Sequence, residues 1–221
     1  MSKMTDAIGW FKQQFGPAIR NGTMGTPFSL DLLTAIALQE TYYIWGKLYQ
    51  TMTPAEVLKL CVGDTIDGRS VFPRSRAELV AEPKGTEMFA IARAALEALG
   101  QHDDTYRRVA NNPDKFCHGF GIFQYDIQFF KSNPDYFLNK RWETFDDCLK
   151  MCVTELNAAL KRTYGQNKAT LSETEMVYVA IAYNRGRADL TKDFKQGFKD
   201  DSGKFYGEYI AEYLQLSKSV P

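Results

Sequence analysis

A glutamate near the start of the chain combines a charge with apolar surroundings. In the segment SLDLLTAIALQETYYIWG (29–46), the residues that would lie one helical turn from Glu40 are all uncharged: Ile36, Ala37, Tyr43 and Ile44. Burial disfavours the charged form of a carboxyl group and so raises its pKa. A carboxyl group that keeps its proton near neutral pH can serve as a general acid. The alternative is a glutamate that reaches solvent at the helix end and has no chemical role.

Two polar side chains arrive together at the end of a second apolar segment. In MVYVAIAYNRG (176–186), Tyr183 and Asn184 come just before Gly186, where the helix is expected to stop. Because Asn and Gly are common where helices end, ordinary C-terminal capping is the alternative explanation for this pattern.

A third segment, HGFGIFQYD (118–126), ends in a carboxylate. Its two glycines permit positive φ angles or a close approach of the backbone. Gln124 offers both a donor and an acceptor, and we expect Phe120, Phe123 and Tyr125 to line a groove. The alternative is a hairpin edge that packs under the core.

The elements that must position these groups are mostly helices. Helix signals include Pro27 and Pro54, each after a threonine, and the capping-box pattern of Ser172 and Glu175. Helices are expected over residues 5–15, 27–45, from 54 onward, 86–99, 104–111, 145–164, 173–186 and 206–216. Strand signals are weak, and we expect only residues 65–72 and 121–125 to pair briefly. The sequence predicts one mainly α domain over residues 1–221, with little or no β structure and an elaborated region at about 50–112.

Together, and in this order, the three segments resemble the goose-type lysozyme and lytic transglycosylase family. That family carries a catalytic Glu followed by Ser near a helix end, then a Gly-Leu-Met-Gln segment, then Ala-Tyr-Asn-Ala-Gly. The matching segments are QET (39–41), GIFQ (121–124) and AYNRG (182–186). The resemblance implies a lysozyme-like helical fold and activity on a polysaccharide.

The chain departs from the family pattern at three positions. Thr41 replaces Ser and keeps a hydroxyl, Phe123 replaces Met and keeps an apolar contact, and Arg185 replaces a small residue. The resemblance covers the core segments but not residues 49–112, a stretch longer than the family pattern leads us to expect there.

The resemblance implies roles for individual residues. Glu40 would be the general acid that protonates the leaving glycosidic oxygen, and Tyr183 would hydrogen-bond near it. Gln124 and Asn184 would bind the sugar or support the groove. Further substrate contacts are implied for Thr41 and for the backbone from Gly121 to Phe123, which would contact an N-acetyl group.

Two aspartates are candidates for a catalytic base. Goose-type lysozymes resemble this chain in carrying an Asp two residues after the motif Gln, here Asp126, and another shortly before the Gly-Phe-Gly segment, here Asp114. An inverting hydrolase needs such a carboxylate roughly 6.5–9.5 Å from the acid, to activate water. We therefore expect Asp126 across a cleft from Glu40, with Asp114 sharing or taking the base role. Lytic transglycosylases need no base.

The expected function is hydrolysis of β-1,4 bonds between N-acetylated amino sugars, in peptidoglycan or chitin, with inversion. The alternatives are a lytic transglycosylase of cell-wall peptidoglycan and a non-catalytic carbohydrate-binding domain. A weaker resemblance links Asp64 and Asp67, in the loop CVGDTIDGRS, to the second acid of chitosanases. An ordinary solvated turn with Asp and Gly is the better explanation of that loop.

Composition limits the expected partners. Basic and acidic residues number 27 each, and no basic run occurs, so nucleic acid is not an expected partner. The net charge of zero is compatible with uncharged chitin as the substrate and slightly disfavours acidic peptidoglycan. No signal peptide or membrane span is visible, so we expect cytoplasmic synthesis with release by lysis or non-classical export. The four cysteines and two histidines lack metal-site spacing, so no metal or cofactor is expected, and the thiols should be buried.

Overall fold

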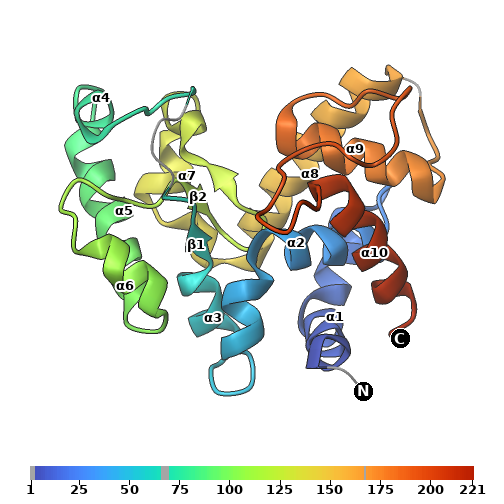
Figure 1. Ribbon diagram of the computed structural model, residues 1–221, viewed down its shortest axis with the longest axis horizontal. Helices are drawn as coiled ribbons and strands as arrows, with labels where there is room; N and C mark the ends of the chain where they lie inside the picture. The colour runs from blue at the N-terminus through green and yellow to red at the C-terminus, as the bar shows by residue number, and fades with distance from the viewer. Residues whose placement is uncertain (1–2, 66–69, 167) are drawn as a thin grey trace. The chain divides into compact units, whose positions relative to one another are not determined.

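The protein is mainly helical, as predicted (Figure 1). The computed structural model describes residues 3–65, 70–166 and 168–221, and these ranges contain ten α-helices and three strands of two residues each. The chain forms two compact units, one from Met1–Tyr42 with Leu149–Pro221 and the other from Tyr43–Cys148. The elaborated region expected at about 50–112 falls within the second unit. The single lysozyme-like catalytic domain stays a prediction.

The first unit is built from helices whose apolar faces meet in its core. These helices are α1 (Lys3–Gly22), the first part of α2 (Leu30–Leu48), most of α8 (Phe145–Tyr164), α9 (Glu173–Arg185) and α10 (Tyr206–Lys218). Buried side chains include Phe11, Ile36, Leu156, Ile181 and Ile210.

Local capping explains where these helices begin and end. α9 begins after Ser172, whose hydroxyl accepts the Glu175 N–H at 3.3 Å, and it ends at Gly186 with a φ of +83°. α2 begins at Leu30, three residues later than expected, because the Ser29 hydroxyl accepts the Leu32 N–H at 3.1 Å and caps the helix there. α1 extends beyond the predicted range, to Gly22.

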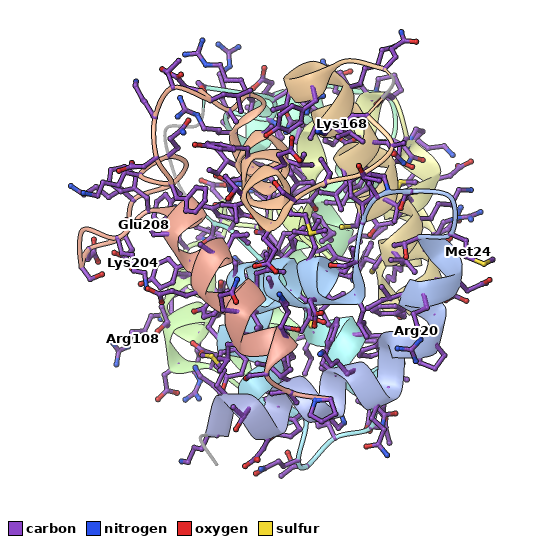
Figure 2. The ribbon with its side chains drawn as sticks, turned by 90° about the vertical axis from the view of Figure 1, so that its right-hand side faces the viewer. Arg20, Met24, Arg108, Lys168, Lys204 and Glu208 are labelled. Carbon is purple, nitrogen blue, oxygen red and sulfur yellow. The ribbon has the colours of Figure 1, made fainter. Side chains whose placement is uncertain are left out.

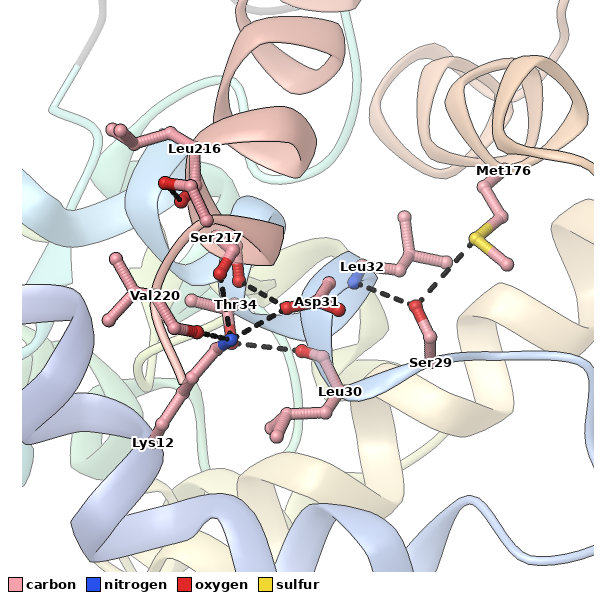
Figure 3. Close-up of polar contacts among 11 residues, drawn as sticks. Lys12, Ser29, Leu30, Asp31, Leu32, Thr34, Met176, Leu216, Ser217 and Val220 are labelled. Atoms are coloured by element: carbon pink, nitrogen blue, oxygen red, sulfur yellow. Dashed lines mark hydrogen bonds and ion pairs between the residues drawn. The ribbon is translucent and has the colours of Figure 1, made fainter. Parts of the chain in front are cut away.

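A charged network ties the end of α10 to α1 and α2 (Figure 3). The Lys12 Nζ lies 2.8 Å from Asp31 Oδ1 and donates to the carbonyl oxygens of Ser217 (2.8 Å) and Val220 (2.6 Å). The Ser217 hydroxyl donates to the same carboxylate oxygen at 2.7 Å. Only 9% of the Lys12 side chain is exposed, so these partners replace the water that would otherwise stabilise its charge.

Replacing Lys12 with Met should lower the free energy of unfolding by about 2 kcal/mol, because Asp31 would lose its countercharge. Urea unfolding followed by circular dichroism measures this difference. The matched control is Lys218→Met, which breaks an exposed ion pair between Lys218 on α10 and Glu173 on α9 and should cost less than about 1 kcal/mol. Equal losses in the two variants would contradict a structural role for the network.

The second unit contains the shorter helices and the sheet. Its helices are the last part of α2, α3 (Pro54–Leu60), α4 (Arg76–Val80), α5 (Gly85–Gly100), α6 (Asp104–Ala110), α7 (Pro134–Leu138) and the start of α8, with the 3-10 helices η1 (Ile127–Lys131) and η2 (Arg141–Glu143). Its strands are β1 (Val62–Gly63), β2 (Gly119–Phe120) and β3 (Tyr125–Asp126), antiparallel in the order β1-β2-β3.

The strands overlap the stretches that were expected to pair only at Tyr125, the first residue of β3. Residues 121–124 form the turn between β2 and β3, and Gly121 has a φ of +85° there. β1 precedes the predicted stretch 65–72, of which residues 66–69 lie outside the described ranges, and Thr65 and 70–72 are not in a strand.

Aromatic side chains fill the core of the second unit. Phe120 on β2 is buried, with ring centroids 4.8 Å from Trp142 and 5.5 Å from Phe137. Phe123 is also buried and contacts the Phe145 ring at 5.8 Å. The expectation that Phe120 and Phe123 line a groove is therefore wrong, because their rings pack into the core instead.

Within residues 3–65, 70–166 and 168–221, the structure has no helix with the length and apolar character needed to cross a membrane.

Candidate functional site

Glu40 meets a tyrosine from the start of α10 within the first unit. The Tyr206 hydroxyl donates to Glu40 Oε1 at 2.9 Å. Tyr206 is buried, and this burial, with the nearby negative charge of Glu40, raises the pKa of Tyr206 well above its ordinary value. A phenol is protonated at neutral pH, and the raised pKa keeps Tyr206 a hydrogen-bond donor to the half-buried Glu40 carboxyl group at more alkaline pH as well.

Tyr183 reaches the same place from α9. Burial raises the pKa of Tyr183 well above its ordinary value, and the neighbouring Cys152 on α8 and Glu40 on α2 raise it further. A hydrogen bond joins its side chain to that of Cys152. The structure thus brings Glu40 together with two protonated phenols, one of which the sequence singled out.

Asn184 holds the segment that connects α9 to α10. Its Oδ1 accepts the Phe198 N–H at 3.4 Å, and the Phe198 carbonyl accepts the Tyr206 N–H at 2.8 Å. Gly197 has a φ of +91°, and a Cβ there would lie 2.6 Å from the Cβ of Tyr206, so this close approach requires glycine. Asn184 is therefore joined through the connecting segment to Tyr206, which contacts Glu40.

A buried amide fixes the middle of the connecting segment. The Gln196 Nε2 donates to the carbonyl oxygens of Asp189 and Asp193, both at 2.9 Å. Its Oε1 accepts the Asp189 N–H at 2.9 Å, and its own carbonyl accepts the Gly207 N–H at 3.0 Å. The segment is irregular in structure but held by specific hydrogen bonds.

The Asp200 carboxylate holds the end of this segment, where the chain enters α10, by accepting several hydrogen bonds. Figure 2 labels Lys204 and Glu208 in this region. Asp200 accepts hydrogen bonds from the hydroxyls of Ser202 (2.7 Å) and Tyr209 (2.5 Å), which lower its pKa to about 2. Its carboxylate also accepts the Lys204 N–H at 3.0 Å. Asp200 is therefore ionised, and able to accept these bonds, well below neutral pH.

Replacing Gln196 with Met should lower the free energy of unfolding by about 2–4 kcal/mol and speed tryptic cleavage within residues 187–204. The side chain keeps its volume, but three partly buried backbone groups, the N–H and carbonyl of Asp189 and the carbonyl of Asp193, lose their partner. Limited trypsin digestion read by mass spectrometry locates the opened segment. The control is Gln215→Met, since Gln215 is exposed on α10. If cleavage is unchanged in Gln196→Met, the amide does not hold the segment.

In the second unit, Gln124 supports its own turn. It adopts a φ of +54°, and its Nε2 donates to the carbonyl oxygens of Gly121 (2.8 Å) and Cys61 (3.4 Å). A Cβ at Gly119 would lie 2.2 Å from Gln124 Oε1, so only glycine admits this side chain. Of the two expected roles for Gln124, these contacts fit support of the local structure.

Asp126 caps the 3-10 helix that follows β3. Its Oδ1 accepts the Gln128 N–H at 2.7 Å, and the residue is half-buried. The carboxylate thus has a structural partner, and the base role stays a prediction.

Asp114 lies on the surface of the second unit. Its side chain is 68% exposed and forms an ion pair with Arg76 at 2.9 Å, whose guanidinium lies over the Phe89 ring. The pair borders a surface hollow of about 340 Å³ that is also lined by Ser75, Ala77 and Val80. This setting gives Asp114 a surface ion-pairing role and adds no support for a base role.

The remaining candidates have mixed outcomes. The Thr41 hydroxyl is buried and donates to the Ala37 carbonyl at 3.3 Å, which fits a structural role better than the substrate contact expected of it. Asp64 follows β1 with a φ of +49°, and Asp67 lies outside the described residues. The four cysteines are buried thiols, as predicted, and burial raises the pKa of Cys148 to about 11.

Comparison of the chain with protein-family models, curated proteins and solved structures gave no match.

Metal-ligating side chains do not gather in the part of the chain that the structure describes. No group of three or more His, Cys, Asp or Glu residues there could hold an ion.

Sequence reasoning missed Tyr206, Gln196 and Phe198. Tyr206 was placed at the start of the last helix, but nothing local distinguishes it from the eleven other tyrosines of the chain. The available signal was a tyrosine at the first position of the amphipathic helix Tyr206–Lys218. A tyrosine hydroxyl that is buried there must find a hydrogen-bond partner.

Proposed function

We propose that the protein is a glycoside hydrolase that cleaves β-1,4 bonds between N-acetylated amino sugars, with Glu40 as the general acid. The observation that supports this most is the 2.9 Å hydrogen bond from the buried Tyr206 hydroxyl to the Glu40 carboxyl group. A half-buried carboxyl group oriented by a fixed donor is what proton transfer to a leaving group requires. The order of the three sequence segments supplies the reaction class.

The proposed chemistry uses the two oxygens of Glu40 differently. Oε1 accepts the Tyr206 hydrogen, so Oε2 would carry the proton that passes to the glycosidic oxygen as its bond to the anomeric carbon breaks. Glu40 then becomes a carboxylate, and the hydrogen bond from Tyr206 strengthens because bonds to ionised acceptors are stronger. The interaction would thus stabilise the transition state more than the ground state.

The second half of the reaction distinguishes hydrolase from transglycosylase. In the hydrolase, water attacks the anomeric carbon and loses a proton to a carboxylate, the role predicted for Asp126. In the transglycosylase, a hydroxyl of the sugar itself attacks, and an anhydro-sugar forms. Peptidoglycan and chitin both carry the required bond, and the balance of 27 basic and 27 acidic residues leaves uncharged chitin fully open.

Glu40→Gln should lower cleavage of purified peptidoglycan or chitin hexamer about a hundredfold or more, because the amide cannot donate the acid's proton. Mass spectrometry of the products measures both rate and chemistry. The control is Glu155→Gln, since Glu155 is also half-buried in the first unit and its pKa is raised by burial. Wild-type activity in Glu40→Gln would end the proposal.

Asp126→Asn tests the base without removing the cap, because Asn caps helices as well as Asp does. If the wild-type products together contain one added water, and Asp126→Asn no longer forms them, the result would support a hydrolase in which Asp126 is the base. Asp103→Asn is the control, since Asp103 also caps a helix of the second unit. Anhydro products, unaffected by Asp126→Asn, would indicate a transglycosylase. If the wild type binds these polysaccharides but does not cleave them, the result would support the alternative of a non-catalytic carbohydrate-binding domain.

A further inference from the structure

An exposed aromatic ring stands on the hydrogen-bonded segment that leads from α9 to Tyr206, the partner of Glu40. The Phe198 side chain is 61% exposed, the largest value among the exposed large aromatic side chains of the described residues. Exposing a ring of this size forgoes the free energy that its burial would release. The Phe198 ring has no hydrogen-bonding group, so the hydrogen bonds that hold the segment at this residue come from its backbone alone.

The backbone of Phe198 connects Asn184 to Tyr206, the hydrogen-bond partner of Glu40. Its N–H reaches Asn184, and its carbonyl receives the N–H of Tyr206, which in turn donates its hydroxyl to Glu40. Gly197 and the buried Gln196 precede it and fix the course of the chain. The backbone that carries the Phe198 ring is therefore linked to Glu40 through the hydrogen bonds of Tyr206.

The polar groups around the ring are suited to a sugar. The Asn184 amide oxygen is used by the Phe198 N–H, while Nδ2 has no partner among the residues that the structure describes and can donate to a hydroxyl or acetamido oxygen. A flat apolar face beside an amide donor matches a pyranose ring, which has apolar C–H faces and a polar rim.

We infer that Phe198 is a substrate-binding residue, on which one pyranose ring of the N-acetylated glycan stacks while Asn184 Nδ2 hydrogen-bonds its rim. This inference rests on the proposed function for its choice of ligand. Stacking would position the chain so that a neighbouring glycosidic oxygen meets Glu40. The ring makes its contact in the ground state and in the transition state alike, so its loss raises KM more than it lowers kcat.

The test separates binding from cleavage by using the Glu40→Gln protein as the background. Its affinity for chitin hexamer, and for a soluble peptidoglycan oligomer, is measured by isothermal titration calorimetry. Adding Phe198→Ala should weaken binding about tenfold, and adding Phe198→Trp should restore it. Leu190→Ala is the matched control, because Leu190 is also exposed (46%) in the same connecting segment.

Unchanged affinity in the Phe198→Ala variant, or an equal loss in the Leu190→Ala variant, would overturn the inference and leave the proposed function intact. Binding of neither oligomer would also overturn it. Wild-type cleavage, assayed separately, decides the proposed function. A protein that binds through Phe198 but does not cleave would uphold the inference while the hydrolase proposal fails.

Discussion

The hydrogen bond between Tyr206 and Glu40 joins the second helix of the chain to the last one. It forms only if α10 begins at the right place, because Tyr206 is its first residue. Hydrogen bonds hold both ends of α10 in place. At the start, Gly207 and Tyr206 are bonded to the Gln196–Phe198 backbone, and at the far end Ser217 joins the buried Lys12–Asp31 network. A long helix anchored at both ends holds its first side chain with little freedom.

Burial has opposite consequences in different parts of the molecule. Around Glu40 it raises the pKa of two phenols that are already protonated at neutral pH, so that they remain donors into the alkaline range. In the second unit it removes Phe120 and Phe123 from any surface role and leaves Gln124 to hold the β2–β3 turn. The segment that first raised the possibility of a sugar groove is thus built mainly as a structural turn, while the exposed aromatic lies in a segment with no regular secondary structure.

Much of the helical framework could be predicted because its signals are local. The capping residues Ser172 and Thr53 and the apolar periodicity of α8 depend only on neighbours in sequence, and these helices begin where expected. The short helices α4 and α7 were missed, since five residues give no periodicity to detect. The position of Glu40 on an apolar helix was readable for the same local reason. Its partner was not, because Tyr206 lies 166 residues away and only packing brings it near. The connecting segment was equally unreadable, since its shape depends on the buried contacts of Gln196.

Catalysis by Glu40 with the help of Tyr206 is tested most directly by the kinetics of the Tyr206→Phe variant. The variant keeps the ring and loses only the hydroxyl that donates to Oε1. With the polymer that the wild type cleaves, we predict a kcat lower by about tenfold or more and a KM close to that of the wild type, because the lost bond is strongest when Glu40 has given up its proton. Unfolding curves establish that the variant is folded. A folded Tyr206→Phe protein with wild-type kcat would contradict the account.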